Sequence, residues 1–242
     1  MNKVPTCSLL AAALALLTVA SYGQTVIDSV PFTITQPGKY ILKSDLTLRP
    51  GKISAISVEA SDVNINLNNF SLLGSTNVGG TAGIGITAFG VHDLTVRNGF
   101  VEQFLIGISI DNSSRIEFSD VHLAANRGVA VRLSSCTDSI IQHCAINKAV
   151  PSLNPGSSAG IEISGGTGIQ VINALIAGTA TERYVFGIGV GGNSRGNYFE
   201  SIYLVNCDTA LKLQAEDKYR AITTTLCPGG IQGGKDVDGQ SN

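Results

Sequence analysis

The 242-residue chain contains no tryptophan, only one methionine and few charged side chains, which make up 14% of its residues. Its formal net charge at pH 7 is −2, and no stretch is rich in lysine or arginine. Proteins that bind nucleic acid need a basic surface against the phosphates, so nucleic acid is not an expected partner. Apolar residues nevertheless make up 43% of the chain, which excludes a disordered composition.

Only the N-terminal region contains a long apolar run. Residues 8–20 are apolar and follow the positively charged Lys3, and Ser21 and Gly23 are small residues at the −3 and −1 positions of a cleavage site. This pattern predicts a secretory signal peptide over residues 1–23. An uncleaved membrane anchor is the less favoured alternative, because a span needs about 20 apolar residues. We therefore expect a secreted, periplasmic or cell-surface protein that has no membrane partner after cleavage.

Glycine is abundant, with 28 residues, and it opens a repeated unit. Each unit reads glycine-apolar-x-apolar, a polar turn, apolar-x-apolar-x-polar and apolar-x-apolar, with clear copies from Gly107, Gly160 and Gly187. Three period-2 segments per unit predict an all-β, three-sided solenoid of about seven coils. The units are expected to open near Ala55 and at Gly83, Gly107, Gly128, Gly160, Gly187 and Thr209.

Alternate residues of each strand are expected to face inward and to build aliphatic columns along the stack. No coil can bury its apolar face alone, so the array is stable only as a stack. The second strand of the sixth clear unit is expected to point Tyr198 inward. The first strands are expected to contribute the inward pairs Ile56/Val58, Ile84/Ile86, Ile108/Ile110, Val129/Val131, Ile161/Ile163, Ile188/Val190 and Leu211/Leu213.

A column of short polar residues separates the second and third strands. Such side chains tolerate a left-handed backbone at a sharp turn and can bond neighbouring backbone groups. We interpret the whole column, its histidine included, as a structural ladder. Its members are Asn69, Asn98, Asp120, His143, Asn173 and Ser201.

The Gly-Ile-x-Ile starts, this polar column and long insertions at the third corner resemble the right-handed parallel β-helix superfamily, the pectate-lyase-like fold. The resemblance covers about residues 50–215 and implies a single-stranded right-handed parallel β-helix. Residues 24–50 are then expected to form N-terminal capping strands, residues 51–215 the β-helix, and residues 216–242 a C-terminal cap and a frayed tail.

The cysteines permit a further constraint on the C-terminal end. Four remain after residue 23, and an even number in an exported chain permits two disulfides in three connectivities. Cys207 ends the last clear coil and Cys227 lies in the tail, so a disulfide between them is one expectation. The alternative is that some cysteines are simply small buried residues, and Cys144 falls in an inward column.

Insertions at residues 148–159 and 177–186 and a loop at 75–82 share one corner, which is typical of a binding face. In enzymes of the fold that this chain resembles, substrate lies along the outer face of the first strand. By alternation, that face carries the candidate catalytic residues Asp111, Arg132 and Glu162. Further candidates for contact with a substrate are Glu59, Lys212, Tyr184 and Phe186, with loop packing as the alternative for the two aromatic residues.

We expect Asp111 and Arg132 to be direct neighbours on adjacent coils, with Glu162 one coil beyond in the adjacent column. Two carboxylates could act as acid and base in glycoside hydrolysis, or the arginine could bind a uronate carboxylate. The alternative is an exposed ion pair worth less than about 1 kcal/mol.

Three functions stay open. In the first, the protein is exported and monomeric and binds an extracellular polymer, for which a polysaccharide is the favoured candidate. The second is a small polysaccharide lyase or glycoside hydrolase, and the third is a structural or adhesive surface module. The sequence motifs of polygalacturonases, the calcium-site carboxylates of pectate lyases and the pectin methylesterase residues have no match here. No cofactor is expected, and calcium enters only if the protein is a lyase.

Overall fold

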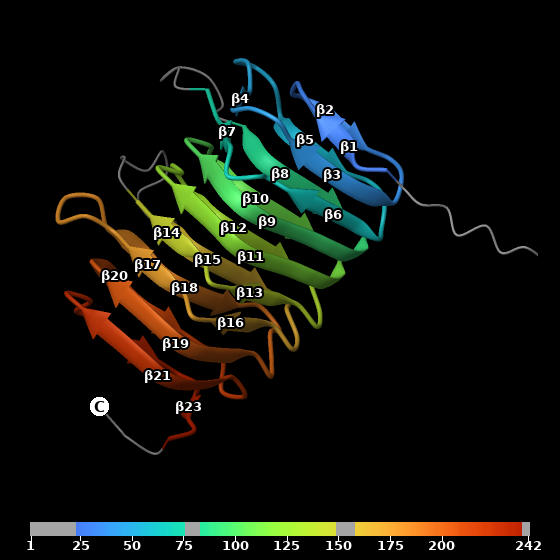
Figure 1. Ribbon diagram of the computed structural model, residues 1–242. Coiled ribbons are helices and arrows are strands. Elements are labelled where there is room, and N and C mark those ends of the chain that lie inside the picture. The colour runs from blue at the N-terminus through green and yellow to red at the C-terminus, as the bar shows by residue number, and fades with distance from the viewer. Residues whose placement is uncertain (1–22, 76–82, 149–157, 239–242) are drawn as a thin grey trace, which may run out of the picture.

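The computed structural model describes residues 23–75, 83–148 and 158–238, and within them all regular elements are β-strands (Figure 1). The predicted signal peptide up to residue 22 and most of the loops at 75–82 and 148–159 lie outside the described residues. In the described part of the chain, no helix has the length and apolar character that crossing a membrane requires.

One side of the molecule is a sheet of nine parallel strands that pair in sequence order, so that successive strands are one turn of chain apart. The seven from β5 to β20 correspond to the predicted first strands, although some of their boundaries differ. The nine strands are β2 (Phe32–Ile34), β5 (Ser54–Val58), β8 (Ile84–Phe89), β10 (Ile106–Asp111), β12 (Val129–Ser134), β15 (Ala159–Ser164), β18 (Tyr184–Gly191), β20 (Cys207–Lys212) and β22 (Ile231–Gln232).

The other two sides form one continuous 14-stranded sheet. Before the C-terminal segment, three coils have a single long strand that covers both sides, and four coils have two short strands that share them. The long strands are β9 (His92–Glu102), β11 (Ser114–Ala124) and β19 (Tyr198–Val205). The short ones are β1 (Thr25–Ile27), β3 (Gly38–Leu42), β4 (Leu46–Thr47), β6 (Val63–Asn66), β7 (Ser71–Leu73), β13 (Ile140–Gln142), β14 (Ala145–Asn147), β16 (Gln170–Ile172) and β17 (Leu175–Ala177). The C-terminal strands β21 (Lys218–Thr225) and β23 (Lys235–Asp236) complete this sheet.

The bend between these two sides falls on the polar column. All six of its residues have a left-handed backbone, with φ between 52° and 60°. A single left-handed residue turns the strand by a corner without ending the ladder on either side of it, and short polar side chains tolerate that conformation better than branched ones do. The side chain of His143 is exposed, and its Nε2 lies 3.4 Å from Nδ2 of Asn173.

Aliphatic side chains fill the inside of the coils in continuous columns. On the third side the register partners from β7 to β19 are large aliphatic residues, each at most 1% exposed. This column contains Leu72, Val101, Leu123, Ile146, Ile176 and Leu204. On the second side Phe199 rather than Tyr198 faces inward: Phe199 is fully buried and is the register partner of Val171.

On the first side the inward pairs of two strands are shifted from the predicted ones. β8 buries Ile86 and Ala88, and β12 buries Val131 and Leu133. The reason is a column of small residues at the start of each strand: Ala55, Gly85, Gly107, Ala130, Gly160, Gly187 and Ala210. A Cβ atom on Gly107 would lie 2.6 Å from the carbonyl oxygen of Ala130 in the next coil. The coil therefore opens at Gly85 and Ala130, and the predicted starts at Gly83 and Gly128 are two residues too early.

Both terminal segments extend the stack. β2 and β3, the strands expected to cap the first coil, pair in parallel with β5 and β6. At the other end β21 pairs with β19, β22 with β20 and β23 with β21, so the strands of the segment expected to cap the last coil continue its parallel ladders up to residue 236. Figure 1 shows β1 and β2 at one end of the stack and β21 and β23 at the other.

Candidate functional site

The outer face of the nine-stranded sheet carries one column of charged side chains. Arg132 on β12 is the register partner of Ser109 on one side and of Glu162 on the other. Glu162 is in turn the partner of Gly189, and Gly189 is the partner of Lys212. Since neighbouring strands lie about 4.8 Å apart, the two cations and the carboxylate are brought together within roughly 15 Å.

Asp111 lies in the adjacent column, with Phe89 and Ser134 as its register partners. The expected contact between Asp111 and Arg132 is therefore wrong. The cause is the start of the coil at Ala130, which moves every residue of β12 two places along the strand relative to β10. Asp111 remains exposed on the outer face, away from the side chains around Glu162.

A hollow of about 260 Å³ opens on this face over β12, β15, β18 and β20. Two cations, one carboxylate and one aromatic ring contribute to its lining, and two glycines leave part of it without side chains. The residues concerned are Arg132, Glu162, Phe186, Lys212, Gly189 and Gly191. A Cβ atom on Gly191 would meet no atom within 4 Å, so the space above this residue is open.

The charged groups of the hollow are paired but accessible. Nε and Nη2 of Arg132 each lie 3.0 Å from Oε2 of Glu162, and the two side chains are 35% and 40% exposed. Nζ of Lys212 lies 5.2 Å from the centre of the Phe186 ring. Ion pairs this exposed are worth less than about 1 kcal/mol, so a ligand could replace one partner at little cost.

No protein-family model and no curated protein match the chain. Solved structures that align with 89% of it include the ORF18 protein of Geobacillus virus E2, with a TM-score of 0.61 and 14% identity, and the enzymatically active domain of tailspike protein 2 of bacteriophage CBA120, with a TM-score of 0.60 and 12% identity. The chain is a right-handed parallel β-helix. It spans 51% and 38% of the lengths of those two chains, and at these identities the likeness concerns the fold alone.

Two of the predicted contact residues lie elsewhere in the β-helix. Tyr184 is fully buried at the start of β18, opposite Cys207, and its hydroxyl has no hydrogen-bond partner among the described residues. The sequence predicts an insertion that ends at Phe186 and therefore a loop position for Tyr184, whereas β18 begins two residues before Phe186. Glu59 is exposed directly after β5, several coils away from the hollow.

A buried lysine that the sequence did not single out supports this end of β18. Lys148 is 3% exposed, and its Nζ donates hydrogen bonds to Oγ of Ser158 at 2.9 Å and to the carbonyl oxygen of Arg183 at 2.6 Å. The ammonium also lies 5.4 Å from the centre of the Tyr184 ring, and burial lowers the pKa of Lys148. These contacts hold the residues that directly precede β15 and β18, and they thereby support the start of β18, where Phe186 lies.

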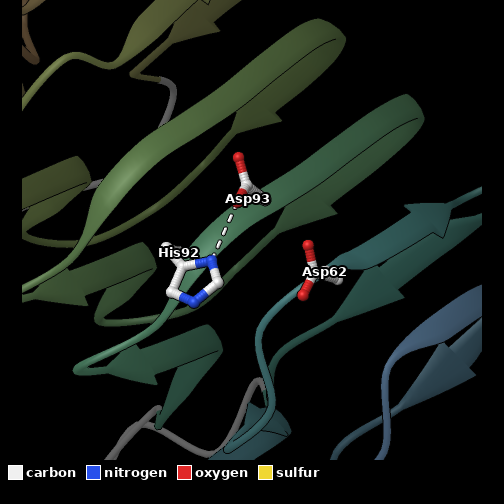
Figure 2. A group of neighbouring side chains, drawn as sticks. All are labelled: Asp62, His92 and Asp93. Carbon is white, nitrogen blue, oxygen red and sulfur yellow. Dashed lines mark hydrogen bonds and ion pairs between the residues drawn. The ribbon is translucent and has the colours of Figure 1, made fainter.

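Another column of residues with a left-handed backbone occupies the corner between the first and second sides. Its members share no residue type, so the sequence pattern did not predict it. It consists of Asp62, Asp93, Arg115, Asp138, Gly168 and Gly196, with φ between 50° and 67°. Asp62, His92 and Asp93 each have one potential ligand atom within 4.8 Å of those of the other two. Figure 2 shows the three side chains as neighbours. Nδ1 of His92 lies 2.8 Å from Oδ2 of Asp93.

Such a group of oxygen and nitrogen atoms can bind a divalent cation. In this β-helix, however, Nε and Nη2 of Arg115 already donate hydrogen bonds to the two oxygens of Asp93 at 2.8 and 2.7 Å. This guanidinium holds the pKa of Asp93 well below its usual range. We therefore interpret this group as part of an ion pair between adjacent coils.

All four described cysteines are free thiols. Cys136 and Cys144 are buried in the interior of the coils, and Cys207 and Cys227 touch each other at the C-terminal end. The disulfide expected between Cys207 and Cys227 is therefore not formed in this structure, although the two residues are neighbours.

Burial raises the pKa of the Cys136 and Cys144 thiols to about 11. A folded-state pKa above the unfolded value of about 8.5 means that their contribution to stability is complete below pH 8.5 and is lost as the pH rises toward 11. We expect the free energy of unfolding to fall by about 1 kcal/mol per thiol by pH 9.5. Urea unfolding of the wild type and of a Cys136→Ala/Cys144→Ala variant at pH 7.5 and 9.5 tests this, since an equal loss in both proteins would contradict it.

Proposed function

We propose that this β-helix binds an extended anionic polysaccharide, such as a polyuronate, along the outer face of β12, β15, β18 and β20. The observation that carries the proposal is the hollow in which Arg132, Lys212 and the ring of Phe186 line one accessible surface. Two cations against one carboxylate leave an excess of positive charge, which favours a ligand that carries carboxylate or sulfate groups.

The regular spacing of the coils supports an extended ligand. Side chains in one outward column recur about every 4.8 Å, so a polymer lying along the axis meets successive groups at a constant interval. Gly189 and Gly191 leave room for a sugar ring beside Phe186, whose flat apolar surface suits the C–H face of such a ring. The Arg132 guanidinium can exchange its bond to Glu162 for one to a ligand carboxylate.

Calorimetric titration of the purified protein with polygalacturonate, alginate and neutral dextran tests this function. The expected result is binding to one or both polyuronates that weakens as salt is raised, because exposed charges are screened over about 10 Å at 0.1 M ionic strength. No binding to either polyuronate, or equally strong binding to dextran, would contradict the proposal.

A catalytic role remains the second candidate because Asp111 and Glu162 both lie on this outer face. From the register, their Cα atoms are two coils and two residues apart, about 12 Å, a separation that the side chains could shorten toward the ~6.5–9.5 Å between carboxyl groups in inverting glycosidases. New reducing ends or unsaturated products from a bound polyuronate, lost in an Asp111→Ala/Glu162→Ala variant, would establish catalysis. Binding without product would leave the protein as a binding module.

Filling the hollow is expected to block binding without unfolding the protein. A glutamine in place of Gly191 meets no atom near its Cβ, so the free energy of unfolding should change by less than about 1 kcal/mol. Its side chain would occupy the space proposed for a sugar ring, and we expect the affinity for polyuronate to fall at least about tenfold, a loss of 1.4 kcal/mol. Unchanged affinity in a folded Gly191→Gln protein would place the ligand elsewhere.

A further inference from the structure

The thiols of Cys207 and Cys227 are neighbours at the C-terminal end of the stack. Leu211 on β20 is the register partner of Ile231 on β22. Cys207 lies four residues before Leu211, and Cys227 lies four residues before Ile231. The two cysteines therefore stand one above the other on adjacent coils. The backbone N–H of Cys207 donates a hydrogen bond to Sγ of Cys227 at 3.4 Å. Neighbouring parallel strands are about 4.8 Å apart, which lies within the Cα separations of 4.4–6.8 Å that disulfides span.

Arg183 holds the backbone around both cysteines. Its Nη2 donates hydrogen bonds to the carbonyl oxygens of Cys207 and Leu226, and its Nε donates to Oδ1 of Asp208 at 2.9 Å. The N–H of Gly229 donates to the carbonyl oxygen of Asp208 at 2.7 Å. The chain on either side of the thiol pair is thus fixed before any covalent bond joins it.

The other two cysteines lack this arrangement. Sγ of Cys136 donates to the carbonyl oxygens of Ile110 and Ser134, and Sγ of Cys144 to that of Gln142, with no second thiol in contact among the described residues. Both are enclosed in the core. Cys227, by contrast, is partly exposed and can be reached by a reagent, whereas Cys207 is fully buried behind it.

We propose that Cys207 and Cys227 form a disulfide staple when the protein meets a disulfide donor such as oxidised glutathione. The Cys227 thiolate attacks one glutathione sulfur and releases one glutathione thiol, which leaves a mixed disulfide on Cys227. The Cys207 thiol then gives up its proton and displaces the second glutathione. The two protein sulfurs are oxidised by two electrons, and the two glutathione sulfurs are reduced.

The staple would hold the most exposed strand of the stack. Most residues of β21 are exposed, and beyond Tyr219 its outer edge has no strand partner among the described residues. A bond between Cys207 and Cys227 closes the coil that contains β21 into a covalent loop, which reduces the freedom of that segment to detach. The stapled form would therefore present a closed end, and the reduced form an end that opens more readily. This inference is independent of the proposed polysaccharide site.

The test is oxidation of the full-length protein with glutathione buffers, in the wild type and in a Cys136→Ala/Cys144→Ala variant that retains only the staple pair among the described cysteines. Peptide mapping without reductant should show Cys207 linked to Cys227 with loss of both thiol hydrogens. Hydrogen exchange of the β21 amides should slow at least about tenfold in the oxidised protein and return on reduction. Cys227→Ser, a change at a partly exposed position, should show the rapid exchange of the reduced form under both conditions.

Persistence of both thiols in oxidised glutathione, or a mixed disulfide on Cys227 that never closes, would overturn the proposal. A linked pair with unchanged exchange in β21 would overturn its role as a staple. The same oxidation-dependent change in Cys227→Ser would assign the effect to another residue.

Discussion

Replacement of Gly187 by valine is expected to leave the protein largely unfolded at 25 °C. A Cβ atom at this position would collide with Cδ2 of Leu204 and would lie 2.6 Å from the carbonyl oxygen of Ala210. One obstacle belongs to a fully buried core side chain and the other to the backbone of the next coil, so neither can move without breaking the ladder. The cost should exceed about 4 kcal/mol, a large part of the 5–15 kcal/mol that stabilises a typical domain.

The matched control is Gly191→Val in the same strand. Its added Cβ meets nothing within 4 Å, so the free energy of unfolding should change by less than about 1 kcal/mol. Circular dichroism and urea unfolding of the two variants measure the difference. Equal urea midpoints would contradict the view that the small-residue column sets the spacing of the coils on this side.

Removing both cations of the hollow is expected to lower the affinity for polyuronate by about 100-fold. A hydrogen bond to a charged group is worth about 1.5–3 kcal/mol, so Arg132→Ala and Lys212→Ala should each cost at least roughly tenfold. Both side chains are substantially exposed, so the fold should not depend on them. Titration calorimetry of the double variant at low salt gives the measurement.

A second double variant distinguishes the effect of the hollow on affinity from the effect of the protein's net charge. Arg97→Ala with Lys218→Ala removes the same two charges from exposed positions on the 14-stranded sheet. We expect it to bind polyuronate within about threefold of the wild type, since long-range effects of exposed charges are screened. If this variant lost as much affinity as Arg132→Ala/Lys212→Ala, binding would depend on overall charge and not on the hollow.

The sequence was sufficient for the architecture because burial alternates along much of the chain, as in β9 and β11. It was insufficient for the register of two coils, those of β8 and β12, because a shift by two residues keeps the same alternation of inward and outward side chains. Gly128 and Ala130 are both small and differ by two positions, and only the close approach of the next coil selects Ala130. That shift decides whether Arg132 lies beside Asp111 or, as the structure shows, beside Glu162.

The positions of the aromatic side chains depend on where a strand begins, and the left-handed columns depend on a backbone conformation that the residue types do not always indicate. Tyr184 and Phe186 both precede the clear part of their repeat, and burial of the first follows from its pairing opposite Cys207. The polar column could be found because three of its six members are asparagine. The column that contains Asp62, Arg115 and Gly196 shares the same left-handed backbone but no common residue type, so no pattern marked it.

The measurement that tests the proposed function most directly is the labelling of individual lysines by an acetylating reagent, with and without saturating polyuronate. We predict slower acetylation of Lys212, which lines the hollow, with no change at Lys39 and Lys218, which are exposed on the 14-stranded sheet. Bound polyuronate that leaves Lys212 as reactive as before, or that protects all three lysines equally, would contradict it.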